Sequence, residues 1–282
     1  MSKLKISNEL LGMEFDPVEV KWNSQKTMLY ALGVGAKPEG ELDYVYEAKG
    51  PKVLPTFAVI PGFGLMFDLI NKVDINLLML LHGEQETTLH RPIPPETKAS
   101  GVGKITEVWD KGKAAVLVLE GTVSDDDGPI FTNKGTIFVR EAGGFGGERG
   151  PSTKGVNVPP DRDPDHVVQD TTLPQQAAIY RLSGDVNPMH IDPDFAKMAG
   201  FEKPFLHGLC SFGFGCRAIV QTLCKNDPDN FKSMKGRFAD QVWMEDTLVT
   251  KIWETGDGEA LFQMETQNGN VVLSQAKATY KP

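Results

Sequence analysis

The chain has 282 residues, and its 38 acidic and 29 basic side chains give a formal net charge of −9. No block of Lys and Arg supplies the electrostatic footprint that a phosphodiester backbone requires, so a nucleic-acid partner is not expected. The purely apolar runs, such as Leu77 to Leu81, are far shorter than the roughly 18 residues of a bilayer-crossing helix, and no membrane segment is predicted. The length suits one large core or two domain-sized ones.

The two halves of the chain resemble each other. The segment MLYALGVGA (28–36) matches AIYRLSGDV (178–186), each with a tyrosine followed two residues later by a leucine. Further along, Trp109 and Trp253 each stand just before a glycine-bearing turn between two β-rich runs. Similarity of this kind at a fixed distance is typical of a duplicated structural unit. We therefore predict two copies of one unit.

A glycine- and proline-rich stretch separates the copies. It covers residues 142–164, between a first repeat at 1–141 and a second repeat at 165–282. Its sequence GGFGG (143–147) could be taken for a phosphate-binding turn, but the G-x-G-x-x-G spacing fails and Pro151 leaves no helix behind it. The stretch is predicted to be a linker, whose residues could still line a ligand groove.

Helices and strands are both expected in the second repeat. Thr172 can cap a short helix over 173–182, and a helical turn is expected over 193–198. A longer helix is predicted over 208–225, because its apolar residues recur at steps of three and four and form one stripe. Four β runs follow, at about 234–244, 247–256, 259–267 and 270–280. One buried helix against such a meander is an α+β unit, and two units would join their sheets edge to edge.

The stretch YRLSGDVNPMHIDP (180–193) combines an acid, an amide and an imidazole in a chain that has five histidines. Pro188 favours a non-helical turn, which can bring Asp185 and His190 to one side of a cavity. An imidazole exchanges protons near neutral pH, and a carboxylate does so in a partly apolar pocket. Asn187 can hold a water molecule by hydrogen bonds without titrating. The run therefore predicts an acid–base site.

The segment LHGL (206–209) stands at the start of the predicted long helix. Free backbone N–H groups near Gly208 would point outward at the positive end of the helix dipole, where a developing oxyanion is stabilised. Glycine fits there because a side chain would block the close approach of a carbonyl group. His207 is interpreted as a residue that orients the loop before the helix, and Asp192 as the cap of the next helical turn.

These residues also have a purely structural interpretation. Turn chemistry alone explains the acid and the amide, and a hydrogen bond to backbone explains a core histidine. Tyr180, which Tyr30 repeats in the first copy, is interpreted as a packing residue. The first copy carries glycines, near Gly35 and Gly40, at the positions of the acid and the imidazole. A structural role would predict the pair in both copies, so a function in the second copy is favoured.

Other chemistries fit the sequence less well. His190, Asp192 and His207 could be drawn together as metal ligands, but none of their spacings is typical of a zinc site, and no metal is expected. The G-x-S-x-G motif of serine hydrolases is absent from the sequence. Cys210 lies beside His207 on the apolar stripe of the long helix, which favours burial over nucleophilic catalysis.

The run YRLSGDVNPMHIDPDFAKMAGFEKPFLHGLCSFGF (180–214) closely resembles the signature of the R-specific 2-enoyl-CoA hydratases, the enoyl-CoA hydratase 2 family. The segments LHGEQ (81–85), GGFGG (143–147) and GRFADQVW (236–243) extend the resemblance over almost the whole chain. Such hydratases occur as separate proteins and as a domain of peroxisomal multifunctional enzyme type 2. The resemblance implies a double hot-dog fold, an active site in the C-terminal repeat, and a non-catalytic N-terminal repeat that accommodates bulky acyl chains.

By position, the resemblance implies a catalytic dyad of Asp185 and His190. It also implies that Asn187 helps to place the water and that the Gly208 N–H binds the thioester oxygen. Four further residues match supporting positions of the family motifs: Glu84, Tyr180, Asp192 and His207.

The implied reaction adds water to a trans-2-enoyl-CoA and gives a (3R)-3-hydroxyacyl-CoA in fatty-acid β-oxidation. Lys235 and Arg237 are candidates for binding the CoA phosphates. CoA belongs to the substrate, so no separate cofactor is expected. Two other functions stay open: a hot-dog acyl-CoA thioesterase, with a carboxylate aimed at the carbonyl carbon, and a non-catalytic acyl-CoA binding module that uses the D-x-N-x-x-H run as a turn.

The cysteines indicate a reducing, intracellular compartment, because Cys210, Cys216 and Cys224 are odd in number and clustered. The start MSKLKISNELLG has no apolar signal core. The resemblance implies a peroxisomal protein and a homodimer. The final residues ATYKP are not a peroxisomal address of the Ser-Lys-Leu type, so a cytoplasmic location stays open.

Overall fold

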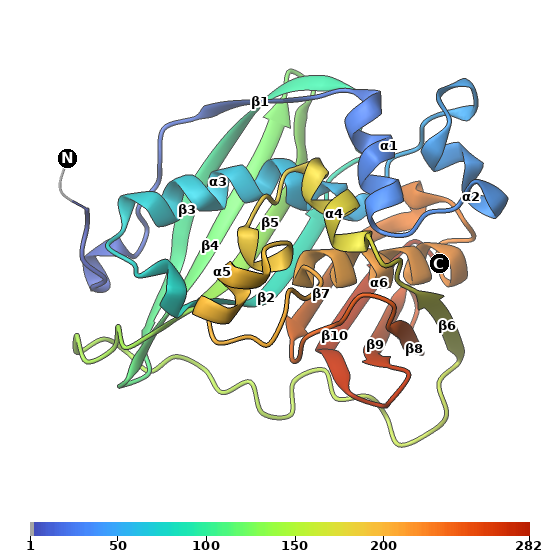
Figure 1. Ribbon diagram of the computed structural model, residues 1–282. Coiled ribbons are helices and arrows are strands. Elements are labelled where there is room, and N and C mark those ends of the chain that lie inside the picture. Colours follow the sequence, from blue (N-terminus) through green and yellow to red (C-terminus); the bar gives the residue numbers. More distant parts are fainter. Residues whose placement is uncertain (1–2) are drawn as a thin grey trace.

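A ten-stranded sheet forms the body of the molecule (Figure 1). The computed structural model describes residues 3–282, without the side chains of residues 63, 67–69 and 78. The strand order is β1-β3-β4-β5-β2-β7-β10-β9-β8-β6, with β2 beside β7 in the middle. The strands are β1 (Val18–Trp22), β2 (Leu80–Leu89), β3 (Thr97–Asp110), β4 (Ala114–Asp125), β5 (Gly128–Arg140), β6 (His166–Thr171), β7 (Phe231–Phe238), β8 (Thr247–Gly256), β9 (Glu259–Thr266) and β10 (Val271–Tyr280).

Two long helices, α3 (Val59–Lys72) and α6 (Gly208–Thr222), lie against the sheet (Figure 1). The shorter helices are α1 (Ser24–Gly33), α2 (Pro38–Val45), α4 (Gln176–Tyr180) and α5 (Pro193–Met198). The 3-10 turns are η1 (Asn8–Leu10), η2 (Glu47–Lys49), η3 (Pro55–Ala58), η4 (Leu77–Met79), η5 (Arg181–Ser183), η6 (Pro188–His190) and η7 (Pro228–Asn230).

Each half of the fold repeats one plan. In β1 to β5 with α3, and again in β6 to β10 with α6, one long helix packs on antiparallel strands, and the strand order of one half mirrors the other about the β2/β7 junction. This confirms the expected α+β class and double hot-dog arrangement. No helix in the described part of the chain is long and apolar enough to cross a membrane.

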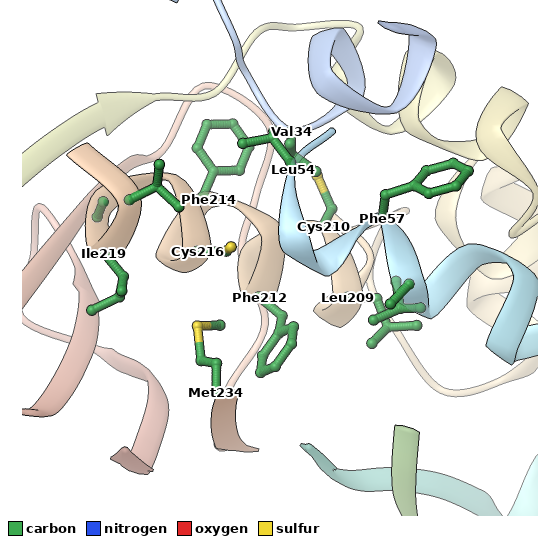
Figure 2. Packing of buried hydrophobic residues seen from close by; sticks show 14 of the residues in the cluster. Val34, Leu54, Phe57, Leu209, Cys210, Phe212, Phe214, Cys216, Ile219 and Met234 are labelled. Carbon is green, nitrogen blue, oxygen red and sulfur yellow. The ribbon is translucent and has the colours of Figure 1, made fainter. Parts of the chain in front are cut away.

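Helix α6 is buried along its length. The stripe predicted from the sequence appears in Figure 2, where Phe212, Cys216 and Ile219 of α6 lie in a cluster that includes Met234 of β7. Burying one large apolar side chain contributes about 1.5–3 kcal/mol, so this stripe holds the helix on the sheet. The helix ends at Thr222, three residues earlier than predicted, because Lys225 and Asn226 adopt left-handed backbone conformations.

Two further predictions were wrong in detail. Thr172 does not cap α4, because its hydroxyl donates to the Asp246 carbonyl at 3.1 Å and the helix starts later, at Gln176. The strand predicted over 234–244 is β7, which begins at Phe231 and ends at Phe238. Beyond it the chain forms a loop that the Asp246 carboxylate closes by accepting the Trp243 N–H.

The linker is fastened to the first repeat by a carboxylate. Asp110, at the end of β3, accepts the N–H groups of Gly112 and Gly144 through Oδ1 at 2.8 and 2.9 Å, and that of Gly146 through Oδ2 at 2.8 Å. These backbone hydrogen bonds lower the pKa of Asp110 from 3.8 to about 2. The GGFGG run therefore binds a carboxylate of its own chain, which agrees with its interpretation as linker and not as a phosphate site.

We expect the Asp110→Asn variant to release the linker, because an amide offers one acceptor oxygen where the carboxylate offers two. Limited proteolysis should cut residues 142–164 faster, and the thermal midpoint should fall. The lowered pKa also predicts that this part of the stability is present above pH 3.8 and is lost as the pH falls towards 2. Asp126→Asn, in the exposed β4/β5 turn, is the control; equal proteolysis of both variants would contradict the assignment.

The sheet opens where the two repeats meet. Strands β2 and β7 pair from Thr88 with Ser233 as far as Glu84 with Arg237, and the ladder stops there. The first residues of β2, from Leu80, pair with β5, whereas the end of β7 pairs with β10. The two half-sheets therefore separate at this end of their shared ladder, beside the first turn of α6.

Candidate active site

A cavity of about 1430 Å³ lies at this opening. Both repeats line it: Asp185, His190 and Gly208 come from the second, and apolar side chains such as Ile60 and Met66 come from the first. Pockets for drug-sized ligands measure roughly 300–1,000 Å³, so this volume suits a longer ligand.

The loop of residues 184–190, the expected catalytic loop, is shaped by its own side chains. The Asp185 carboxylate accepts the Asn187 N–H at 3.3 Å, and Asn187 Oδ1 accepts the Met189 N–H at 3.1 Å. Asn187 thereby caps the short turn η6, which Pro188 opens and His190 ends. These local bonds hold a tight turn that brings His190 back beside Asp185.

The environment of His190 fixes its tautomer. Its Nδ1 lies 2.9 Å from the Phe205 carbonyl oxygen, which is an acceptor, so Nδ1 carries the proton and Nε2 keeps its lone pair. Burial, with 9% of the residue exposed, lowers the pKa of His190 from 6.5 to about 4, and the bond to Phe205 opposes this only in part. His190 is therefore a neutral base at physiological pH.

His207 joins the parts of the site. Its Nε2 donates to the Asp185 backbone carbonyl at 3.1 Å, and its ring stacks on that of His190 with centroids 3.9 Å apart. Its other side contacts the Tyr180 ring at 4.9 Å. Burial, aided by the neighbouring His190, lowers the pKa of His207 to about 2, so the ring stays neutral. The sequence-based interpretation of His207 as an orienting residue agrees with these contacts.

The carboxyl group of Asp185 completes the cluster. A carboxylate oxygen of Asp185, a ring nitrogen of His190 and a ring nitrogen of His207 lie within 4.8 Å of one another. Burial, with 7% of the residue exposed, raises the pKa of Asp185 from 3.8 to about 6, and the hydrogen bond from the Asn187 N–H opposes the rise. At neutral pH a carboxylate thus stands beside an uncharged imidazole. Two acceptors of this kind suit one water molecule, which has two protons to donate.

Gly208 begins α6 at the edge of the cavity. A Cβ at this position would lie 3.0 Å from Phe238 Cδ1, so a side chain would crowd the ring, whereas glycine leaves the backbone accessible. Within the described residues its N–H has no acceptor, as expected for the first residue of a helix. The helix dipole adds to the attraction for a developing negative charge.

The other candidates fall into two groups. Tyr180 and Asp192 lie outside the cavity lining: Tyr180 packs on Tyr30 with ring centroids 6.0 Å apart, and Asp192 caps α5 by accepting the Asp194 N–H at 2.9 Å. Asn187, Glu84, Lys235 and Arg237 line the cavity.

The Asp185 cluster has the composition of a metal site. Both imidazoles place one nitrogen on a backbone carbonyl, and their rings are tilted by 33°. Metal-bound histidines commonly make such backbone bonds too. That the site works without a metal stays a prediction.

Two lining residues were not identified from the sequence. Phe238 lies against Gly208, and His82 of β2 packs on the Phe238 ring with centroids 5.1 Å apart. Both stand at the opening between the half-sheets. The segments LHGEQ and GRFADQVW that carry the resemblance contain them, but the sequence does not show that the two segments meet.

Two protein families match most of the chain. Residues 20–141 match the family described as MFE-2 hydratase 2 N-terminal domain, and residues 156–276 match the MaoC like domain. The probable enoyl-CoA hydratase 2 of Dictyostelium discoideum is 38% identical over 97% of this chain and 96% of its own length.

Solved structures show the same similarity. A MaoC-like dehydratase from Phytophthora capsici has a TM-score of 0.86 and 30% identity, over 98% of this chain and 97% of that one. Full-length peroxisomal multifunctional enzyme type 2 from Drosophila melanogaster has a TM-score of 0.83 and 35% identity, over 94% of this chain and 48% of that one.

A double hot-dog with a buried aspartate and histidine beside the start of its second long helix defines a MaoC-like dehydratase in the broad sense. The chain belongs to the enoyl-CoA hydratase 2 family, as the match over nearly its full length establishes.

The protonation states can be tested by NMR titration. We expect the Asp185 carboxyl carbon to titrate with a midpoint near pH 6, because burial disfavours its charged form. His190 should stay neutral with its proton on Nδ1, and His207 with its proton on Nε2, down to about pH 5. A midpoint near 4 for Asp185, or near 6.5 for His190, would contradict this electrostatic description.

Proposed function

We propose that the protein hydrates trans-2-enoyl-CoA thioesters to (3R)-3-hydroxyacyl-CoA in fatty-acid β-oxidation. The observation that carries the proposal is the convergence of three groups on one cavity: the Asp185 carboxylate, the His190 Nε2 lone pair and the N–H of Gly208. Membership of the enoyl-CoA hydratase 2 family supports it.

In the proposed mechanism a water molecule donates its hydrogen bonds to Asp185 and His190. Its oxygen attacks C3 while one of its O–H bonds breaks, and the dyad receives the proton. The C2–C3 π electrons move toward the thioester, whose oxygen becomes enolate-like and accepts the N–H of Gly208. The same proton then passes to C2, so one molecule of water is added and the dyad is restored. A donor of this kind contributes on the order of 3 kcal/mol to transition-state stabilisation.

We assign the acyl chain to the part of the cavity formed by the first repeat. Its apolar lining includes Ile60, Met66 and Ile70 of α3 and Ile137 of β5. This supports a division of the chain into a non-catalytic repeat at 1–141, a linker at 142–164 and a catalytic repeat at 165–282.

Dyad variants test the function. We expect Asp185→Asn and His190→Gln to lower kcat for crotonyl-CoA by about 10²- to 10⁴-fold, the usual contribution of general acid–base catalysis, with binding nearly unchanged. Loss of the enoyl absorbance measures the rate, and chromatography of the product gives its chirality. A release of free thiol would indicate a thioesterase. Unchanged rates in both variants would indicate that the dyad has no catalytic role.

The same variants have a matched control in Asp192→Ala. It removes the cap of α5 and should lower the stability by about 1 kcal/mol while kcat is retained. Asp185→Asn should instead lower kcat and raise the stability. Because burial raises the pKa of Asp185 from 3.8 to about 6, replacing its charge should stabilise the protein at pH 7 by at most about 3 kcal/mol.

Lys235 and Arg237 are proposed to bind the CoA phosphates. Both line the cavity from β7, and Glu84 of β2 holds them, with Oε–N distances of 3.3 Å to Lys235 and 4.0 Å to Arg237. Their side chains are nearly half exposed, so they can exchange the carboxylate for a phosphate.

We expect Lys235→Met to raise KM for crotonyl-CoA by about fivefold, the effect of one exposed ion pair, and to leave kcat unchanged. With crotonyl-N-acetylcysteamine, a thioester without phosphates, the variant should equal the wild type. Lys277→Met is the control, because Lys277 pairs with Glu259 at 2.9 Å and does not line the cavity. An equal rise in KM with both substrates would argue against phosphate binding by Lys235.

We also propose the oligomeric state and the location of the protein from the family resemblance. A homodimer and a peroxisomal location agree with the family motifs, and the similarity to the Drosophila peroxisomal multifunctional enzyme supports the latter. The reaction balances with water and the enoyl-CoA alone, so no cofactor besides the CoA of the substrate is proposed.

A further inference from the structure

A counterpart of the catalytic loop persists in the first repeat. Residues 34–41 correspond to residues 184–191 in the alignment of the two halves, and Pro38 corresponds to Pro188, which opens the turn of the catalytic loop. Glycines stand where the catalytic acid and imidazole would be.

Side chains of α6 occupy the space beside this counterpart loop. Gly35 has a φ of +84°, and a Cβ there would lie 2.4 Å from Phe214 Cε1 and 3.1 Å from Arg217 Nη1. The catalytic side is open by contrast. Gly64 of α3 lines the cavity, and a Cβ on it would meet none of the described atoms within 4 Å. One of these two spaces in the duplicated fold is therefore occupied by the protein itself, and the other is free.

The backbone beside the occupied space holds the catalytic repeat. The Gly33 carbonyl accepts Gln176 Nε2 at 2.6 Å and the Cys210 thiol at 3.3 Å. The Val34 carbonyl accepts Arg217 Nη1 at 3.2 Å. Carbonyls of the first repeat thus bind α6 near both its start and its middle.

The strongest of these contacts is a buried ion pair. Arg217 Nε and Nη2 donate to the two Glu41 oxygens at 2.9 and 2.6 Å, with Arg217 2% and Glu41 8% exposed. Gln221 Nε2 adds a bond to Glu41 at 3.1 Å. Arg217 Nη1 also reaches Asp170 at 3.2 Å, and Lys37 neutralises that carboxylate at 3.0 Å. The group is balanced, with two positive and two negative charges.

We propose that Glu41 and Arg217 are positioning residues, which hold α6 along its axis so that the Gly208 N–H meets the thioester oxygen. The apolar stripe of α6 holds the helix on the sheet and its close packing limits sliding, but hydrophobic contacts are themselves non-directional. A planar two-bond fork fixes position and direction. Arg217 lies about two and a half turns from Gly208, about 13 Å along one rigid helix. This inference rests on the proposed hydratase function.

The test is the double variant Glu41→Leu/Arg217→Met, which removes both charges and leaves the pair of Lys37 and Asp170. Replacing a whole buried ion pair by apolar side chains is often tolerated in folding. We expect kcat for crotonyl-CoA to fall by about 10- to 100-fold, as a misplacement of about 1 Å predicts, with KM within about twofold of the wild type. The absorption band of bound cinnamoyl-CoA, which moves to the red when a donor polarises its thioester, should shift less.

Ile219→Val is the matched control, because it trims a buried side chain of the same helix outside the ion pair. It should lower the thermal midpoint and leave kcat and the red shift at wild-type values. Glu41→Gln keeps the volume and provides a second test, with a smaller loss of red shift. Folded variants with wild-type kcat and red shift would overturn the proposal. A wild-type protein without hydratase activity would overturn the proposed function instead.

Discussion

The hydrogen bond from the His207 imidazole to the Asp185 carbonyl joins the catalytic loop to the first turn of α6. The rest of the site depends on it, because the acid belongs to the loop whereas the N–H donor belongs to the helix. The His207 ring also supports the imidazole of His190 by stacking. Burial keeps the ring neutral, so the donating N–H is retained over the working range of pH.

Burial acts on the two members of the dyad in opposite directions. It raises the pKa of Asp185 to about 6 and lowers that of His190 to about 4, since each charged form loses hydration. The order of the two groups is reversed relative to water, and both pKa values lie below neutral pH. A proton taken from water by the pair is therefore held loosely and can be returned to carbon. Burying the Asp185 carboxylate lowers the stability of the fold, and the same burial makes the group reactive.

The two similar halves of the chain differ in how much space they leave beside their long helices. Both halves present a long helix and a turn beside the α1 and α4 segments, and the Tyr30 and Tyr180 rings meet between them. In one half the side chains of α6 fill the space, and in the other Gly64 of α3 leaves it open. The filled half contributes acceptors and an ion pair to the helix of the open half. The two repeats are thus structurally interdependent although one of them carries the acid–base residues.

The sequence by itself determined the duplication, the stripe of α6, the turn at Pro188 and the residue types of the dyad, because these depend on local periodicity and turn chemistry. It placed Asp192 as a cap for the same reason. The hydrogen bond of Thr172 and the contact of His82 with Phe238 were decided by tertiary structure, since each depends on a segment distant in sequence. The protonation states of Asp185 and His190 also required the fold. Their pKa values are set by burial, and burial exists only once both repeats have packed around them.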